Sequence, residues 1–119
     1  MGIFVHILSS RFYMKLAVSF DMDSDTIARD FDGTLFFKMY DIDDGEVICS
    51  EIMSTMGKFG AENLSEMLIL LKADALLCGE ISPESEAALD DEGISFYSGF
   101  EGDADDVVQG FISGIYHFE

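Results

Sequence analysis

Several features that would point to export, membrane insertion or disulfide stabilisation are missing from this sequence. Its 119 residues include no tryptophan, one proline, and no apolar run approaching the ~20 residues that cross a bilayer. Two cysteines, Cys49 and Cys78, cannot build a disulfide framework, and no basic region followed by a small-residue cleavage site indicates a signal peptide. We therefore expect one cytoplasmic domain whose two thiols are reduced.

Basic residues are also scarce. The chain has 6 Lys and Arg against 24 Asp and Glu, which gives a net charge of −18, and no Lys or Arg follows Lys72. Such a surface repels nucleic acid and anionic membranes, so neither is an expected partner. It would suit a cation or a protein partner with a basic surface, although the charge could also serve only to keep a monomer or weak homodimer in solution.

The first 13 residues differ from the rest because they are apolar with one His and one Arg. Met14 opens a clearer strand pattern, so we treat 1–13 as an N-terminal extension or the product of an upstream start. An added edge strand is the alternative, because Ile3, Val5 and Ile7 alternate along it. Residues 14–119 form the single predicted domain.

Apolar spacing divides this domain into strands and helices. Asp43-Asp44-Gly45 separates two strand-like runs, and Asp-Gly there predicts a hairpin because Gly adopts the positive φ of the turn. Further on, apolar residues recur at helical spacing, and Ser82-Pro83-Glu84 is typical of a helix start. The predicted strands are 15–20, 34–42, 46–53, 75–78 and 94–97, and the predicted helices cover about 61–71, 82–92 and 103–115.

This order predicts an α/β fold with a five-stranded mixed sheet. The later β–α–β–α segments favour parallel pairing of 15–20, 75–78 and 94–97, with helices packed on the sheet. The hairpin contributes the antiparallel pairing.

Four stretches of the sequence, in this order and spacing, match one known family. They are Met14-Lys-Leu-Ala-Val-Ser, Phe37-Lys-Met-Tyr-Asp-Ile-Asp-Asp-Gly-Glu-Val, Asp74-Ala-Leu-Leu-Cys-Gly with Pro83 beyond it, and Gly93-Ile with Gly102-Asp-Ala-Asp-Asp-Val-Val. On these residues the chain resembles the dinitrogenase iron–molybdenum cofactor biosynthesis family. The resemblance implies a ribonuclease H-like, three-layer α/β/α fold and the binding of iron–sulfur or iron–molybdenum clusters, without catalysis.

The resemblance also implies which residues would hold a cluster, and these depart from the family pattern. Asp30-Phe31-Asp32 stands where the family commonly has His-Phe-Gly or Arg-Phe-Gly, so two carboxylates replace a base and a glycine. An anionic cluster would be repelled there, which indicates altered or lost cluster affinity. The implied cofactor-binding residues are Asp30, Phe31, Asp32, Lys58, Gly60, Cys78 and Gly79.

Carboxylates near this motif suggest two other cation chemistries. Asp30-Phe31-Asp32-Gly33-Thr34 matches the first motif of haloacid dehalogenase-type phosphatases, which use two Asp residues with Mg²⁺. However, that reaction needs a later cation, and none follows Lys72. Asp21, Asp23 and Asp25 alternate as in a calcium loop, but the glycine and final glutamate of that loop are absent.

The resemblance thus implies a non-enzymatic metallocluster binding or carrier protein with no catalytic residues. Cys78, after a predicted strand, is the soft ligand we expect at the site, and Asp21, Asp23 and Asp30 are the hard oxygen ligands, although Cys78 could instead be a buried packing residue. The alternatives are an acidic protein-interaction or regulatory module without a cofactor and a Mg²⁺-dependent phosphatase.

Overall fold

The computed structural model describes residues 13–114 of the chain, and side chains within that range except that of Phe59. The expectations for residues 1–12 therefore lie outside the described residues. Tyr13 opens the first strand. No helix of the described part is long and apolar enough to cross a membrane.

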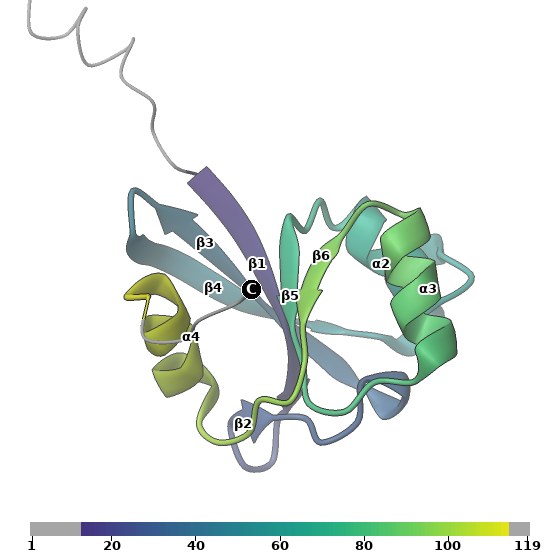
Figure 1. Ribbon diagram of the computed structural model, residues 1–119, viewed down its shortest axis with the longest axis horizontal. Helices are drawn as coiled ribbons and strands as arrows, with labels where there is room; N and C mark the ends of the chain where they lie inside the picture. The colour runs from purple at the N-terminus through teal and green to yellow at the C-terminus, as the bar shows by residue number, and fades with distance from the viewer. Residues whose placement is uncertain (1–12, 115–119) are drawn as a thin grey trace, which may run out of the picture.

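One mixed sheet forms the centre of the fold, with strand order β4-β3-β1-β5-β6 (Figure 1). The parallel pairs β1–β5 and β5–β6 confirm the predicted parallel neighbours, and β3 pairs antiparallel with both β1 and β4. The sheet has six strands rather than five, because a two-residue strand also pairs with β1. The strands are β1 (Tyr13–Asp21), β2 (Thr26–Ile27), β3 (Phe36–Asp43), β4 (Glu46–Ser54), β5 (Ala75–Leu77) and β6 (Ser95–Tyr97).

The β3–β4 hairpin turns where the sequence predicted it. Asp44 and Gly45 both have positive φ, at 56° and 84°, which is the geometry that twists a tight hairpin in the same sense as its strands. β4 is an edge strand of the described sheet, and most of its residues are exposed.

Three α-helices and two short 3₁₀ helices complete the described fold. Each α-helix begins at a polar cap: the side chains of Asn63, Ser82 and Asp103 accept hydrogen bonds from backbone amides in the first turn. The start at Ser82 was predicted from the sequence. The helices are η1 (Phe31–Gly33), η2 (Met56–Gly60), α2 (Leu64–Leu70), α3 (Pro83–Asp91) and α4 (Ala104–Ile112).

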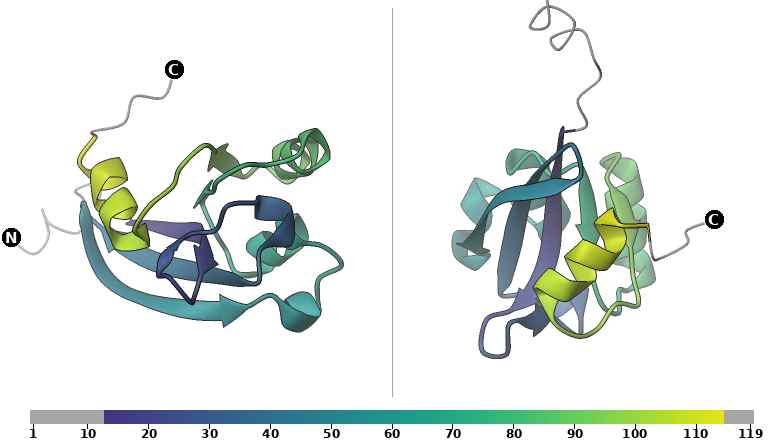
Figure 2. Two further views of the ribbon diagram at one scale, coloured as in Figure 1. Left: turned by 90° about the horizontal axis from the view of Figure 1, so that it is seen from below. Right: turned by 90° about the vertical axis from the view of Figure 1, so that its left-hand side faces the viewer.

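The helices cover both faces of the sheet, so the predicted three-layer α/β/α arrangement is confirmed (Figure 2). Alternate residues of β1 point to opposite cores because strand side chains alternate. Leu16, Val18 and Phe20 pack in a cluster that includes α4 residues, whereas Ala17 belongs to the cluster that includes residues of α2 and α3.

Candidate functional site

Loops from three parts of the chain meet at the carboxyl ends of β1, β5 and β6. The segment after β2 lies along the segment after β5: Glu80 N donates to Arg29 O at 2.8 Å, and Phe31 N donates to Glu80 O at 2.8 Å. On the other side, Gly99 N donates to Gly79 O at 2.9 Å. Ligands of open α/β sheets bind at this kind of edge, so these loops define the candidate site.

Gly79 lets the two segments approach closely. A Cβ at this position would lie 2.5 Å from Arg29 O and 2.6 Å from Ala28 O, which no side chain tolerates without backbone movement. Gly79 is also buried, so among the predicted cofactor-binding residues it has a packing role.

The Asp32 carboxylate is bound to the start of α3. It accepts hydrogen bonds from Ser82 N at 3.2 Å, from the Ser82 hydroxyl at 3.2 Å, and from the Ser85 hydroxyl. A carboxylate is stabilised there because helix N-termini carry unpaired amides and a partial positive charge. Asp32 therefore joins the first loop to a helix that begins 51 residues later.

The other two residues of this motif are also structural. Asp30 caps η1, since its side chain accepts a hydrogen bond from Asp32 N at 3.2 Å. Phe31 is buried in the core under α2 and α3, with its ring centroid 6.2 Å from that of Phe37. The Asp-x-Asp motif of a haloacid dehalogenase-type phosphatase follows a buried apolar strand, whereas only the two-residue β2 precedes Asp30 here.

Lys58 and Arg29 are the basic side chains that line the four pockets of this edge. Lys58, in η2, shares a pocket of about 290 Å³ with Asp32 and Ser85. Arg29 lines three others, of about 360, 620 and 480 Å³. Gly60 ends η2 with φ 88° and is exposed, so it shapes the turn before α2.

The sequence and fold of this chain match known proteins. The model of the dinitrogenase iron–molybdenum cofactor family matches residues 14–114. The chain belongs to this family. No curated protein matches the sequence.

Solved structures support the fold of this family member. PH0822 superimposes with a TM-score of 0.76 at 24% identity, covering 85% of this chain and 92% of PH0822. A candidate dinitrogenase from Methanocaldococcus jannaschii gives 0.69 at 26% identity, with coverages of 87% and 91%. The apo form of the orange protein from Desulfovibrio gigas gives 0.73 at 19% identity, with coverages of 92% and 96%.

In this member of the family, the predicted soft ligand is buried. Cys78 is fully enclosed in the core under α2 and α3, and burial, with the charges of Glu86 and Asp32, raises the pKa of its thiol to about 12. The β1–β5 register puts Ser19 on the same face, and its buried hydroxyl has no hydrogen-bond partner among the described residues. The Cys78 thiol is therefore protonated, and a metal ligand must be the thiolate.

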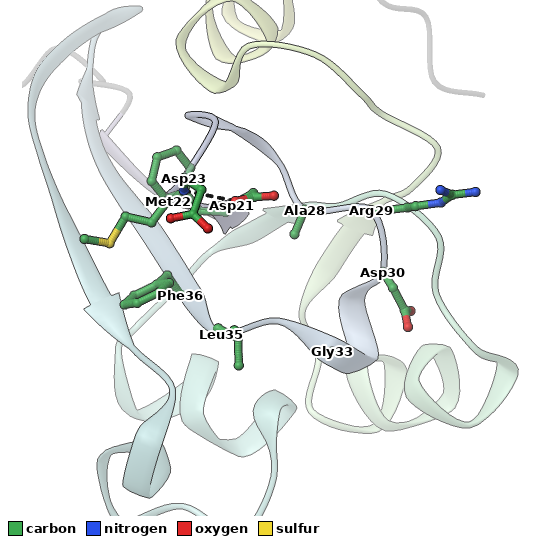
Figure 3. Close-up of a pocket in the computed structure, with 10 residues that line it drawn as sticks. Asp21, Met22, Asp23, Ala28, Arg29, Asp30, Gly33, Leu35 and Phe36 are labelled. Atoms are coloured by element: carbon green, nitrogen blue, oxygen red, sulfur yellow. Dashed lines mark hydrogen bonds between the residues drawn. The ribbon is translucent and has the colours of Figure 1, made fainter.

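The structure does not assemble the predicted metal ligands of this family member. Asp21, Asp23 and Asp30 line one open pocket, but Cys78 does not, and nowhere in residues 13–114 do three His, Cys, Asp or Glu side chains converge as a metal site would require. The Asp21 carboxylate accepts instead from Asp23 N at 3.0 Å, which shapes the loop after β1 (Figure 3).

Sequence reasoning missed three residues of the site. The sequence indicates Ser82 only as part of a helix start, because nothing local shows that Ser82 and Ser85 bind Asp32 across 50 and 53 positions. Arg29 could have been found, since it directly precedes the Asp30-Phe31-Asp32 motif in a chain with few basic residues.

Proposed function

We propose that this protein is a non-catalytic binding or carrier protein for a metallocluster of the iron–sulfur or iron–molybdenum type. The observation that supports it is the family match across 14–114, combined with the four pockets at the loop edge. The cluster is cargo in this proposal, and it binds at the edge formed by the loop after β2, η2 and the segment after β5.

The residues of this edge favour weak retention of cargo. Arg29 and Lys58 attract an anionic cluster, whereas Asp30, Asp32 and Glu80 oppose it. Iron–sulfur clusters are normally held by several thiolates, and Cys78 is one buried thiol. We therefore expect protein purified in air to hold no stoichiometric cluster, and reconstituted protein to hold one weakly or between two chains.

Iron, molybdenum and acid-labile sulfide analysis after anaerobic reconstitution tests this proposal. Because Cys78 is buried, a cluster can reach its thiolate only if the core beside β5 opens during reconstitution. Cys78→Ser should then abolish the reconstituted visible absorption, whereas Cys49→Ser, which changes the exposed thiol of β4, should leave it intact. Arg29→Gln should lower the cluster content without changing the fold. A tightly held cluster indifferent to Cys78, or one lost with Cys49 alone, would contradict this placement.

An acidic interaction module without cargo is the second candidate. Two observations favour it: residues 13–114 contain no group of three His, Cys, Asp or Glu side chains that could hold a metal ion, and the chain has a net charge of −18. Anaerobically reconstituted protein that contains neither iron nor sulfide would select this function over the first.

A further inference from the structure

One pocket of the described surface combines apolar side chains with carboxylates. It has a volume of about 360 Å³ and lies between the loop after β1 and the start of β3 (Figure 3). Phe20, Met22, Leu35 and Phe36 are its large apolar lining residues. Met22 is 51% exposed and Leu35 is 70% exposed, so the pocket offers apolar surface directly to the solvent. Exposed apolar side chains that gather in this way, with polar groups around them, mark interaction sites.

The backbone of Leu35 is joined to the segment that follows β4. Thr55 N donates to Leu35 O at 2.9 Å, and the Thr55 hydroxyl lies 3.2 Å from the same oxygen. Met56 follows Thr55 and is 89% exposed. Methionine adapts its shape to a partner, which is why it is common at binding surfaces.

The charge around this pocket selects the kind of partner. Asp21, Asp23 and Asp30 all line it. Arg29 also lines it, but its guanidinium points away from Met22 and Phe36 (Figure 3). The rim is therefore negative, and a basic group that binds there gains Coulomb energy while its neighbour fills the apolar part.

A second copy of the chain is a poor occupant. Each chain carries a net charge of −18, so two copies repel one another, and three of the carboxylates lie at the pocket rim, where two copies would meet. A basic protein lacks this repulsion and is steered toward the rim by the same field.

We propose that this acidic–apolar pocket docks a protein partner through an apolar side chain flanked by lysine or arginine. The pocket is one of the four at the loop edge of the proposed cargo site, so this inference names the partner of that function and rests on it for its biological meaning. The docking itself requires no cluster, because none of the pocket residues needs a metal to present its surface.

Fluorescence anisotropy of the cluster-free, full-length protein tests the proposal. The probe is a fluorescein-labelled peptide in which leucine alternates with lysine, and its counterpart carries glutamate in place of lysine. We expect the lysine peptide alone to bind. Leu35→Ser should weaken binding about tenfold, and Asp21→Asn with Asp23→Asn several-fold, with the charge effect lost at high salt.

Matched variants separate a specific pocket from general charge attraction. Ile69→Ser changes an apolar side chain of α2 that is 39% exposed, and Asp90→Asn with Asp91→Asn removes the same charge from α3. Each should change binding by less than about twofold. Equal weakening by these controls, or no binding of the lysine peptide, would overturn the proposal.

Light scattering tests whether a second copy of the chain occupies the pocket instead. A wild-type dimer that Leu35→Ser converts to a monomer would show that this pocket pairs two copies, and would overturn the basic-partner assignment. Because the peptide assay uses cluster-free protein, its failure and a failure of cluster reconstitution are separate results.

Discussion

Removal of the Asp32 carboxylate should destabilise the fold, although the side chain is exposed. Asp32→Ala takes away the acceptor of three hydrogen bonds, from Ser82 N, the Ser82 hydroxyl and the Ser85 hydroxyl. A net hydrogen bond contributes about 0.5–1.5 kcal/mol, and the lower half of that range applies where water can replace the acceptor. Together with the lost charge at the start of α3, worth about 0.3–1 kcal/mol, the expected cost is about 2 kcal/mol.

Urea unfolding, monitored by far-ultraviolet circular dichroism, measures this loss of unfolding free energy, since the chain has no tryptophan to report unfolding by fluorescence. For a domain of this size, about 2 kcal/mol corresponds to a Tm lower by roughly 8 °C. The denaturant slope should not change, because the folded and unfolded surfaces remain the same. Asp32→Asn keeps one acceptor oxygen and should fall between wild type and Asp32→Ala.

Asp30→Ala is the matched control from the same loop. Its carboxylate accepts one local hydrogen bond, from Asp32 N, so we expect a loss of about 0.5–1 kcal/mol. If Asp32→Ala costs no more than this control, the Asp32 carboxylate is not held by α3, and the assignment of Asp32 as a structural residue is wrong.

Three further predictions concern the core and the thiols. Tyr40→Phe removes the hydroxyl that bonds to Asp105 at 2.7 Å and should cost ~1 kcal/mol at pH 7. This hydrogen bond, together with Lys38, holds the pKa of Asp105 below its usual range. The loss of stability in Tyr40→Phe should therefore be complete above about pH 4 and should shrink as the pH falls through the lowered pKa of Asp105. Urea unfolding of both proteins at each pH measures this dependence. Gly79→Ala should cost ~3 kcal/mol or prevent folding, as thermal melts will show, because its Cβ would lie 2.5 Å from a backbone oxygen. In thiol titration with Ellman's reagent, Cys78 should react only after unfolding, whereas the exposed Cys49 reacts in the native protein, and fast native reaction of both would refute the burial of Cys78.

Much of the fold could be predicted because its signals are local. The Asp-Gly turn, the polar helix caps and the short apolar runs each act through residues close in sequence, so their elements appear where expected. β2 could not be predicted, because the two residues Thr26–Ile27 are too few to show the alternation of apolar and polar side chains that marks a strand. This strand forms by pairing with the end of β1.

The details of the site depend on contacts that sequence spacing does not encode. The alternation of Asp21 and Asp23 indicated cation ligands, but the loop uses the Asp21 carboxylate for its own backbone. The alternative reading of Cys78 as a packing residue agrees with its burial, which the apolar run before it suggested. By contrast, the attachment of Asp32 to α3 joins two distant segments, and only the tertiary structure reveals it.

Among residues 13–114, β4 is an edge strand, which has a consequence for how this protein behaves in concentrated solution. An open strand edge offers unpaired backbone groups to any other strand, and proteins often guard it with charge. β4 carries Glu46 and Glu51 but no lysine or proline, so its guard against a second copy is electrostatic repulsion between like charges. Such repulsion fades when the Debye length falls to about 3 Å near 1 M salt. We therefore expect the acidity of this chain to keep its copies apart and high ionic strength to remove that protection.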